Sequence, residues 1–144
     1  MNLLTPELRL ALRANAVEAQ VANARGSHFD PVPVVKLFNP VGAATWLATE
    51  LDDDDDTLFG LADLGFGCPE LGSFSLSEIA ALRLPFGLAI ERDLTFATVH
   101  RLSRWADAAR HQGSISRAEA WLWLAEVPPR RGPDPLPFPD PEDG

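Results

Sequence analysis

Charged side chains that interrupt otherwise apolar segments are the residues of this chain with the clearest capacity for chemistry. Lys36, Glu50 and Asp63 fall in successive strand-like segments, and an antiparallel sheet would place cross-strand neighbours about 5 Å apart. Clustered carboxylates shift one another's pKa, so one interpretation is a pocket for a divalent ion or for acid–base catalysis. A second interpretation is the solvent-facing side of a half-exposed sheet, and we favour it because alternating polar positions are typical of such sheets. The full predicted cluster comprises Lys36, Glu50, Asp63, Glu70, Glu91, Arg92 and Asp93.

The aspartate run 52–56 resembles the first half of a calcium-binding loop. Asp52, Asp54 and Asp56 fall at positions 1, 3 and 5 of an EF-hand count, and Asp63 falls at position 12. However, Thr57 stands where that loop needs a glycine for its turn, and an aspartate stands where it needs a bidentate glutamate. We therefore expect a solvated hairpin loop, and we assign no metal ligand, no cofactor and no catalytic residue.

Two tryptophans stand out near the C-terminus. Trp121 and Trp123 lie in the segment 114–127, where Ser116 and Glu119 match a capping box and predict a helix. Side chains two positions apart point to well-separated sides of a helix, so one buried face cannot hold both rings. At least one ring should be exposed, which is uncommon without a reason. The helix is expected either to cap the core, which we favour, or to dock a partner through these rings.

A change of hydrophobic period at Val32 separates predicted helices from predicted strands. Helical spacing indicates one helix over 5–25 and another over 98–112, the second capped by Thr98. The segments between them are joined by short turns, and such connections link antiparallel neighbours. We predict an α+β fold in which an antiparallel meander sheet of four to five strands packs on the N-terminal and C-terminal helices. The predicted strands are 32–38, 45–51, 57–64, 70–76 and 88–94, with a brief helix over 75–82.

The length and apolar content fit one domain. The chain has 144 residues and is 46% apolar, which suffices for one packed core and is too little for two. We expect a single domain over 1–113, a C-terminal helix over 114–127 and a disordered, proline-rich acidic tail over 128–144. Cys68 is the one cysteine, which excludes an intramolecular disulfide. Without a signal-peptide pattern or an apolar run of ~20 residues, we expect a cytoplasmic protein with no membrane contact.

The net charge of −9 is concentrated in the middle of the chain. Residues 28–97 hold twelve acids and three bases, which are Lys36, Arg83 and Arg92. A field of this sign repels phosphate backbones, which argues against direct nucleic-acid binding, and attracts proteins with basic surfaces. Solubility alone is the simpler explanation of the same charge.

Three motifs taken together resemble a known bacterial family. They are GAATWLATE at 42–50, FGLADLGFGCPELG at 59–72 and IERD at 90–93, preceded by LLTPELR and VVKLF. The likeness covers roughly residues 3–111 and is to the family called domain of unknown function 2958. It implies a small stand-alone protein often encoded on plasmids, conjugative elements and other mobile DNA. It implies no established activity, so no site residue is transferred from it.

These observations lead to two hypotheses of different class. The first is a non-enzymatic accessory protein of a mobile genetic element that binds another protein, with DNA mimicry towards a basic, nucleic-acid-binding host protein as one mode. The second is a metal-dependent enzyme using the strand carboxylates. An enzyme needs those carboxylates to converge in a concave, partly dry pocket, whereas a mimic needs them spread over a convex surface. The sequence predicts neither a particular partner nor an oligomeric state.

Overall fold

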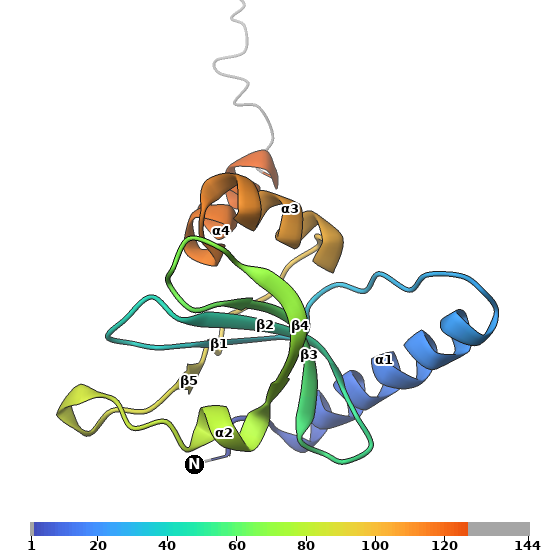
Figure 1. Cartoon of the computed structure of the whole chain (residues 1–144), viewed down its shortest axis with the longest axis horizontal. Helices are drawn as coiled ribbons and strands as arrows, with labels where there is room; N and C mark the ends of the chain where they lie inside the picture. The colour runs from blue at the N-terminus through green and yellow to red at the C-terminus, as the bar shows by residue number, and fades with distance from the viewer. Residues whose placement is uncertain (1, 127–144) are drawn as a thin grey trace, which may run out of the picture.

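The strand-like segments between residues 32 and 94 form a five-stranded antiparallel sheet, which confirms the predicted fold class (Figure 1). In the computed structural model, which describes residues 2–126, the order across the sheet is β4-β3-β2-β1-β5. The tail predicted over 128–144 and the last residue of the helix predicted over 114–127 lie outside the described residues. The strands are β1 (Val35–Phe38), β2 (Thr45–Leu51), β3 (Thr57–Asp63), β4 (Glu70–Ser75) and β5 (Glu91–Arg92).

The fifth strand is much shorter than the predicted 88–94. Only two of its residues pair with β1, and the backbone N–H of Asp93 adds one further bond to the carbonyl of Lys36 at 2.9 Å. The Asp93 carboxylate then accepts a hydrogen bond from the backbone N–H of Thr95 at 3.0 Å. This local turn directs the chain away from the sheet and ends the strand.

The N-terminal helix α1 (Pro6–Ala24) and the short α2 (Leu76–Ala80) cover one face of the sheet. The Thr5 hydroxyl caps α1 and Pro6 opens it, as their preferences predict. The Asn15 side chain of α1 donates to the carbonyl of Thr49 at 2.9 Å, at the bulge where the β2–β3 register shifts. Within residues 2–126, no helix is long and apolar enough to cross a membrane. The core of this face includes Leu4, Leu12, Leu37, Trp46, Leu51 and Leu58.

The opposite face of the sheet is covered by α3 (Leu102–Gln112) and α4 (Ile115–Glu126), which form a helical hairpin (Figure 1). Leu47 of β2 and Leu61 of β3 pack there against Trp105 of the first helix and Leu122 of the second. The prediction that this face is exposed to solvent is therefore wrong. Its polar residues are tolerated under the helices because most of them have specific partners, as described below.

Helix α3 begins at Leu102 and not at Thr98. Asp30, far away in the sequence, accepts hydrogen bonds from the backbone N–H of Ser103 at 3.0 Å and from the Ser103 hydroxyl. The predicted cap, Thr98, instead accepts from the indole N–H of Trp105 at 3.1 Å. The Asp30 carboxylate thus caps α3, the role that the sequence predicted for Thr98.

Candidate functional site

Lys36 is the centre of an ion-pair group that joins β1 to α4. Its ammonium nitrogen lies 2.6 Å from a carboxylate oxygen of Glu119 and 3.5 Å from one of Asp93. Partial burial raises the pKa of Asp93, but hydrogen bonds from Thr95 and the charge of Lys36 outweigh it, so the pKa lies below its ordinary value. One lysine thus pairs with two carboxylates, so the group keeps one net negative charge while it ties β1 to α4. Glu119 provides the shortest contact. The predicted capping box of Ser116 and Glu119 is wrong, because α4 begins at Ile115 and the Ser114 hydroxyl accepts from the backbone N–H of Arg117 at 3.1 Å.

Asp63 is almost fully buried, with 1% of its surface exposed, and it caps α4 from the end of β3. Its Oδ2 accepts a hydrogen bond from the backbone N–H of Ile115 at 2.9 Å, and Oδ1 accepts one from Gly65 at 2.9 Å. A carboxylate at a helix N-terminus also interacts favourably with the helix dipole. Asp63 was a candidate catalytic carboxylate, but both of its oxygens accept hydrogen bonds from backbone N–H groups.

The predicted cross-strand neighbours do not face one another directly. The β-sheet register places Leu47 opposite Lys36, Phe59 opposite Glu50 and Thr45 opposite Asp63. Although these polar residues occupy the same face of the sheet, each is paired with an apolar residue or a threonine. For Glu50 the partner depends on a bulge between Ala48 and Glu50, which shifts the β2–β3 register and leaves no mark in the sequence.

Glu50 lies in a separate hollow of about 230 Å³. Burial, with the nearby charge of Asp52 as the second cause, raises the pKa of Glu50 above its ordinary value. A carboxylic acid with a raised pKa in a hollow is a recognised indication of function. The other residues that line the hollow are Ala19, Asn23, His28, Phe29 and Phe59.

Replacing Glu50 with glutamine is expected to raise Tm at neutral pH, because it removes a partly buried charge. A carboxyl group whose folded-state pKa is raised lowers stability above that pKa, and this cost disappears as the pH falls through it. The gain of the Glu50→Gln variant should therefore shrink in melts recorded from pH 7 down to pH 4. A variant that is less stable than wild type at pH 7 would show that the charge of Glu50 makes a favourable contact.

The remaining members of the predicted cluster lie apart from one another. Glu70 and Glu91 are exposed on β4 and β5, the two outermost strands of the sheet. The guanidinium of Arg92 donates to the carbonyl of Leu3 at 2.8 Å and ties the N-terminal segment to the sheet edge. Among the described residues, no three His, Cys, Asp or Glu side chains are grouped so as to hold a metal ion.

The aspartate run forms the tip of the β2–β3 hairpin, and two of its carboxylates organise that tip. Hydrogen bonds from Thr57 and from the backbone of Asp56 lower the pKa of Asp54, and hydrogen bonds from Ser75 and Ser77 lower that of Asp56. Both groups thus stay charged at neutral pH. The tip is a hairpin loop, as predicted.

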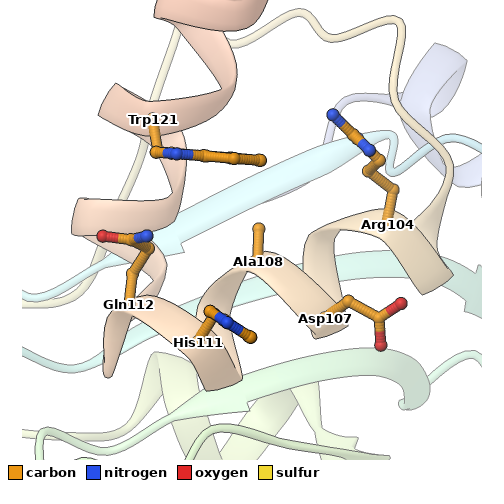
Figure 2. A pocket seen from close by; sticks show the side chains of 6 residues that line it. All are labelled: Arg104, Asp107, Ala108, His111, Gln112 and Trp121. Carbon is orange, nitrogen blue, oxygen red and sulfur yellow. The ribbon is translucent and has the colours of Figure 1, made fainter.

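A hollow between the two C-terminal helices was not predicted from the sequence (Figure 2). Ile115, Ala118 and Leu122 carry the buried side of α4, so the helix caps the core. Trp121 and Trp123 are 44% and 62% exposed, which confirms that one buried face cannot hold both rings. Trp121 reaches over α3, where the Arg104 guanidinium carbon lies 5.4 Å from its ring centre.

This hollow has a volume of about 280 Å³ and combines an aromatic wall with several polar groups. In Figure 2 the indole of Trp121 lies edge-on opposite Ala108, with the polar side chains of α3 around it. Spacing along one helix could have found Arg104, Asp107, Ala108 and His111, which lie three or four residues apart. Only the packing of the hairpin brings Trp121 to them. The lining residues are Arg104, Asp107, Ala108, His111, Gln112 and Trp121.

Sheet order and helix placement define an α+β protein whose open antiparallel sheet carries helices on both faces. The chain belongs to the family described as "Protein of unknown function (DUF2958)", whose model matches residues 3–116, which confirms the resemblance. The match ends at the start of α4. No curated protein and no solved structure matches the chain.

Proposed function

We propose that this protein is an accessory protein of a mobile genetic element that acts by binding another protein and has no catalytic activity of its own. The observation that supports the proposal is where the carboxylates of the predicted cluster lie and what they contact. Asp63 caps a helix and Asp93 pairs with Lys36, while Glu70 and Glu91 are exposed and apart. An acid–base or metal site needs such groups to converge, whereas a binding surface needs them spread and charged.

The surface we propose for the partner is the acidic end of the molecule, where the hairpin tip meets the first turns of α1 and α2. Asp55 pairs with Arg9 of α1 at 2.8 Å, and the Asp56 carboxylate accepts from the backbone N–H of Ser77 of α2 at 2.8 Å. These contacts hold the tip in place and leave all of its carboxylates except that of Asp56 exposed. The exposed carboxylates of the acidic end are Glu7, Asp52, Asp53, Asp54, Asp55 and Glu78.

The partner is a protein with a basic surface, and a DNA-binding protein is the natural class. Fixed carboxylates on a protruding tip present negative charge at set positions, as a phosphate backbone does. The mobile-element setting implied by the family resemblance adds a reason for such a target, because a host protein that binds incoming DNA would be blocked by a mimic.

The test is capture of DNA-binding proteins by the tagged full chain from a bacterial lysate, followed by elution with duplex DNA. Asp52→Asn/Asp53→Asn removes two exposed charges of the acidic end, and Glu70→Gln/Glu91→Gln removes two elsewhere on the sheet as the matched control. We expect wild type and control to retain a protein that DNA displaces, and the hairpin variant to retain several-fold less. Equal retention by all three, or retention that DNA does not displace, would refute the mimic.

A further inference from the structure

The hollow between α3 and α4 combines a flat apolar wall with donors of hydrogen bonds. Trp121 and Ala108 supply the apolar surface, and Arg104, His111 and Gln112 supply polar groups at its rim (Figure 2). Grooves lined by aromatic rings bind proline-rich segments, because such segments hold a preformed polyproline II helix whose apolar rings pack on the aromatic faces. The chemistry of the hollow is therefore suited to prolines accompanied by acidic side chains.

The helical hairpin holds slightly more bases than acids, although the whole protein is acidic: residues 101–126 contain four arginines and three acids. Of the acids in this hairpin, Glu119 pairs with Lys36 and Glu126 lies 2.9 Å from His100. Asp107 lines the hollow and is 3.7 Å from Arg110, which offsets its charge. The hairpin is left with a surplus of one positive charge, and the Arg104 guanidinium carbon lies 5.4 Å from the ring centre of Trp121. The four arginines are Arg101, Arg104, Arg110 and Arg117.

The chain leaves the described structure close to this hollow. Glu126 ends α4, and its contact with His100 places that end beside the start of α3. Trp121 is five residues earlier, which corresponds to about 8 Å along a helix axis. The seven residues between Glu126 and Asp134 span up to about 23 Å, so the following segment can reach the ring.

The segment 133–143 has the composition that the hollow requires. It contains five prolines, four acids and no base, with Leu136 and Phe138 between prolines. The segment and Trp121 also lie in the same part of the chain relative to the family match. That match ends at residue 116, so both Trp121 and the segment lie beyond it. Trp121 and the segment thus both belong to the part of the chain that follows the family region.

We infer that the hollow between α3 and α4 binds the proline-rich acidic segment 133–143 of the same molecule. Prolines stack on Trp121, and the acids pair with Arg104 and its neighbours. A covalently attached segment reaches an effective concentration of the order of millimolar, so even a weak site is occupied. This inference is independent of the acidic end, which lies at the other end of β3.

The test follows the indole N–H signals of the four tryptophans in the nitrogen-15-labelled full chain. Substituting Pro135→Ser, Pro137→Ser and Phe138→Ser together should shift the Trp121 signal. Trp46 and Trp105 are buried, so their unchanged signals report an intact fold. In wild type, raising NaCl from 0.05 to 0.5 M should move the Trp121 signal towards its position in the variant, because salt screens exposed ion pairs. A synthetic peptide of residues 132–144 added to the variant should return the signal to its wild-type position.

A matched control changes the same part of the chain outside the segment. Arg130→Ser/Arg131→Ser should leave the Trp121 signal unchanged. The inference fails if the proline variant leaves the Trp121 signal in place, or if the added peptide does not restore it. A Trp121 signal that depends on protein concentration, with a doubled mass in solution, would assign the hollow to the segment of a second copy and would overturn binding within one molecule.

Discussion

Replacing Gly60 with alanine is expected to disrupt the pairing of β2 with β3 and to lower stability by at least about 3 kcal/mol. A Cβ atom at this position would lie 1.8 Å from the carbonyl oxygen of Leu47 and 2.9 Å from its carbonyl carbon. Both are backbone atoms of a central strand, so the clash is relieved only if β2 and β3 move apart. That movement would break the hydrogen bonds between them. For a chain of this length, Tm should fall by roughly 10 °C or more, which thermal denaturation followed by circular dichroism will measure.

Gly72 provides the matched control, because it lies directly opposite Gly60 in β4. A Cβ atom there has no neighbour within 4 Å. Gly72→Ala should be neutral or should raise stability by about 0.4–1 kcal/mol, since alanine restricts the unfolded chain. Equal Tm values for the two variants would contradict the close approach of β2 and β3 at Gly60.

Replacing Asp63 with alanine is expected to lower stability by about 2–3 kcal/mol and Tm by roughly 6–12 °C. The substitution removes the acceptor of two backbone hydrogen bonds, from Ile115 and Gly65. Because the site is buried, water cannot replace the carboxylate easily. Amide hydrogen exchange should increase first at the start of α4, where the backbone N–H of Ile115 loses its acceptor.

Two further substitutions separate the cap from a general effect of charge. Asp63→Asn keeps one acceptor oxygen and should cost less than the alanine variant. Asp53→Ala removes an exposed aspartate from the hairpin tip and should change stability by no more than about 0.5 kcal/mol. A Tm for Asp63→Ala within the error of that for Asp53→Ala would show that α4 does not depend on this cap.

The central strands and the first helix were predictable because their signals are local. Thr45–Leu51 matches the predicted strand at both ends, and α1 (Pro6–Ala24) begins and ends within one residue of the predicted helix 5–25. The start of α3 was not predictable, because its capping carboxylate, Asp30, belongs to another part of the chain. The start of α4 combines a local cap, the Ser114 hydroxyl, with a distant one, the Asp63 carboxylate. Such distant bonds leave no periodic trace in the sequence.

The candidate sites were also hard to predict because they depend on contacts between distant parts of the chain. Lys36 and Asp63 interrupt apolar strands, which suggested a solvent-exposed face, yet both lie beneath the helices and are matched by specific partners. An alternating pattern indicates which positions are polar but not what covers them. The exposure of the tryptophans followed from helical geometry alone. The hollow beside Trp121 did not, because it depends on how two helices pack.

The order in which the two faces of the sheet are covered has a consequence for synthesis of the chain. All five strands precede α3 in the sequence, so a growing chain completes the sheet before residues 102–126 can cover Leu47 and Leu61. During that interval the nascent sheet presents an apolar face to chaperones and to other unfinished chains, the circumstance in which partly folded proteins aggregate. Mutations that weaken the attachment of the helical hairpin will therefore reduce the yield of folded protein in the cell by more than their effect on melting indicates.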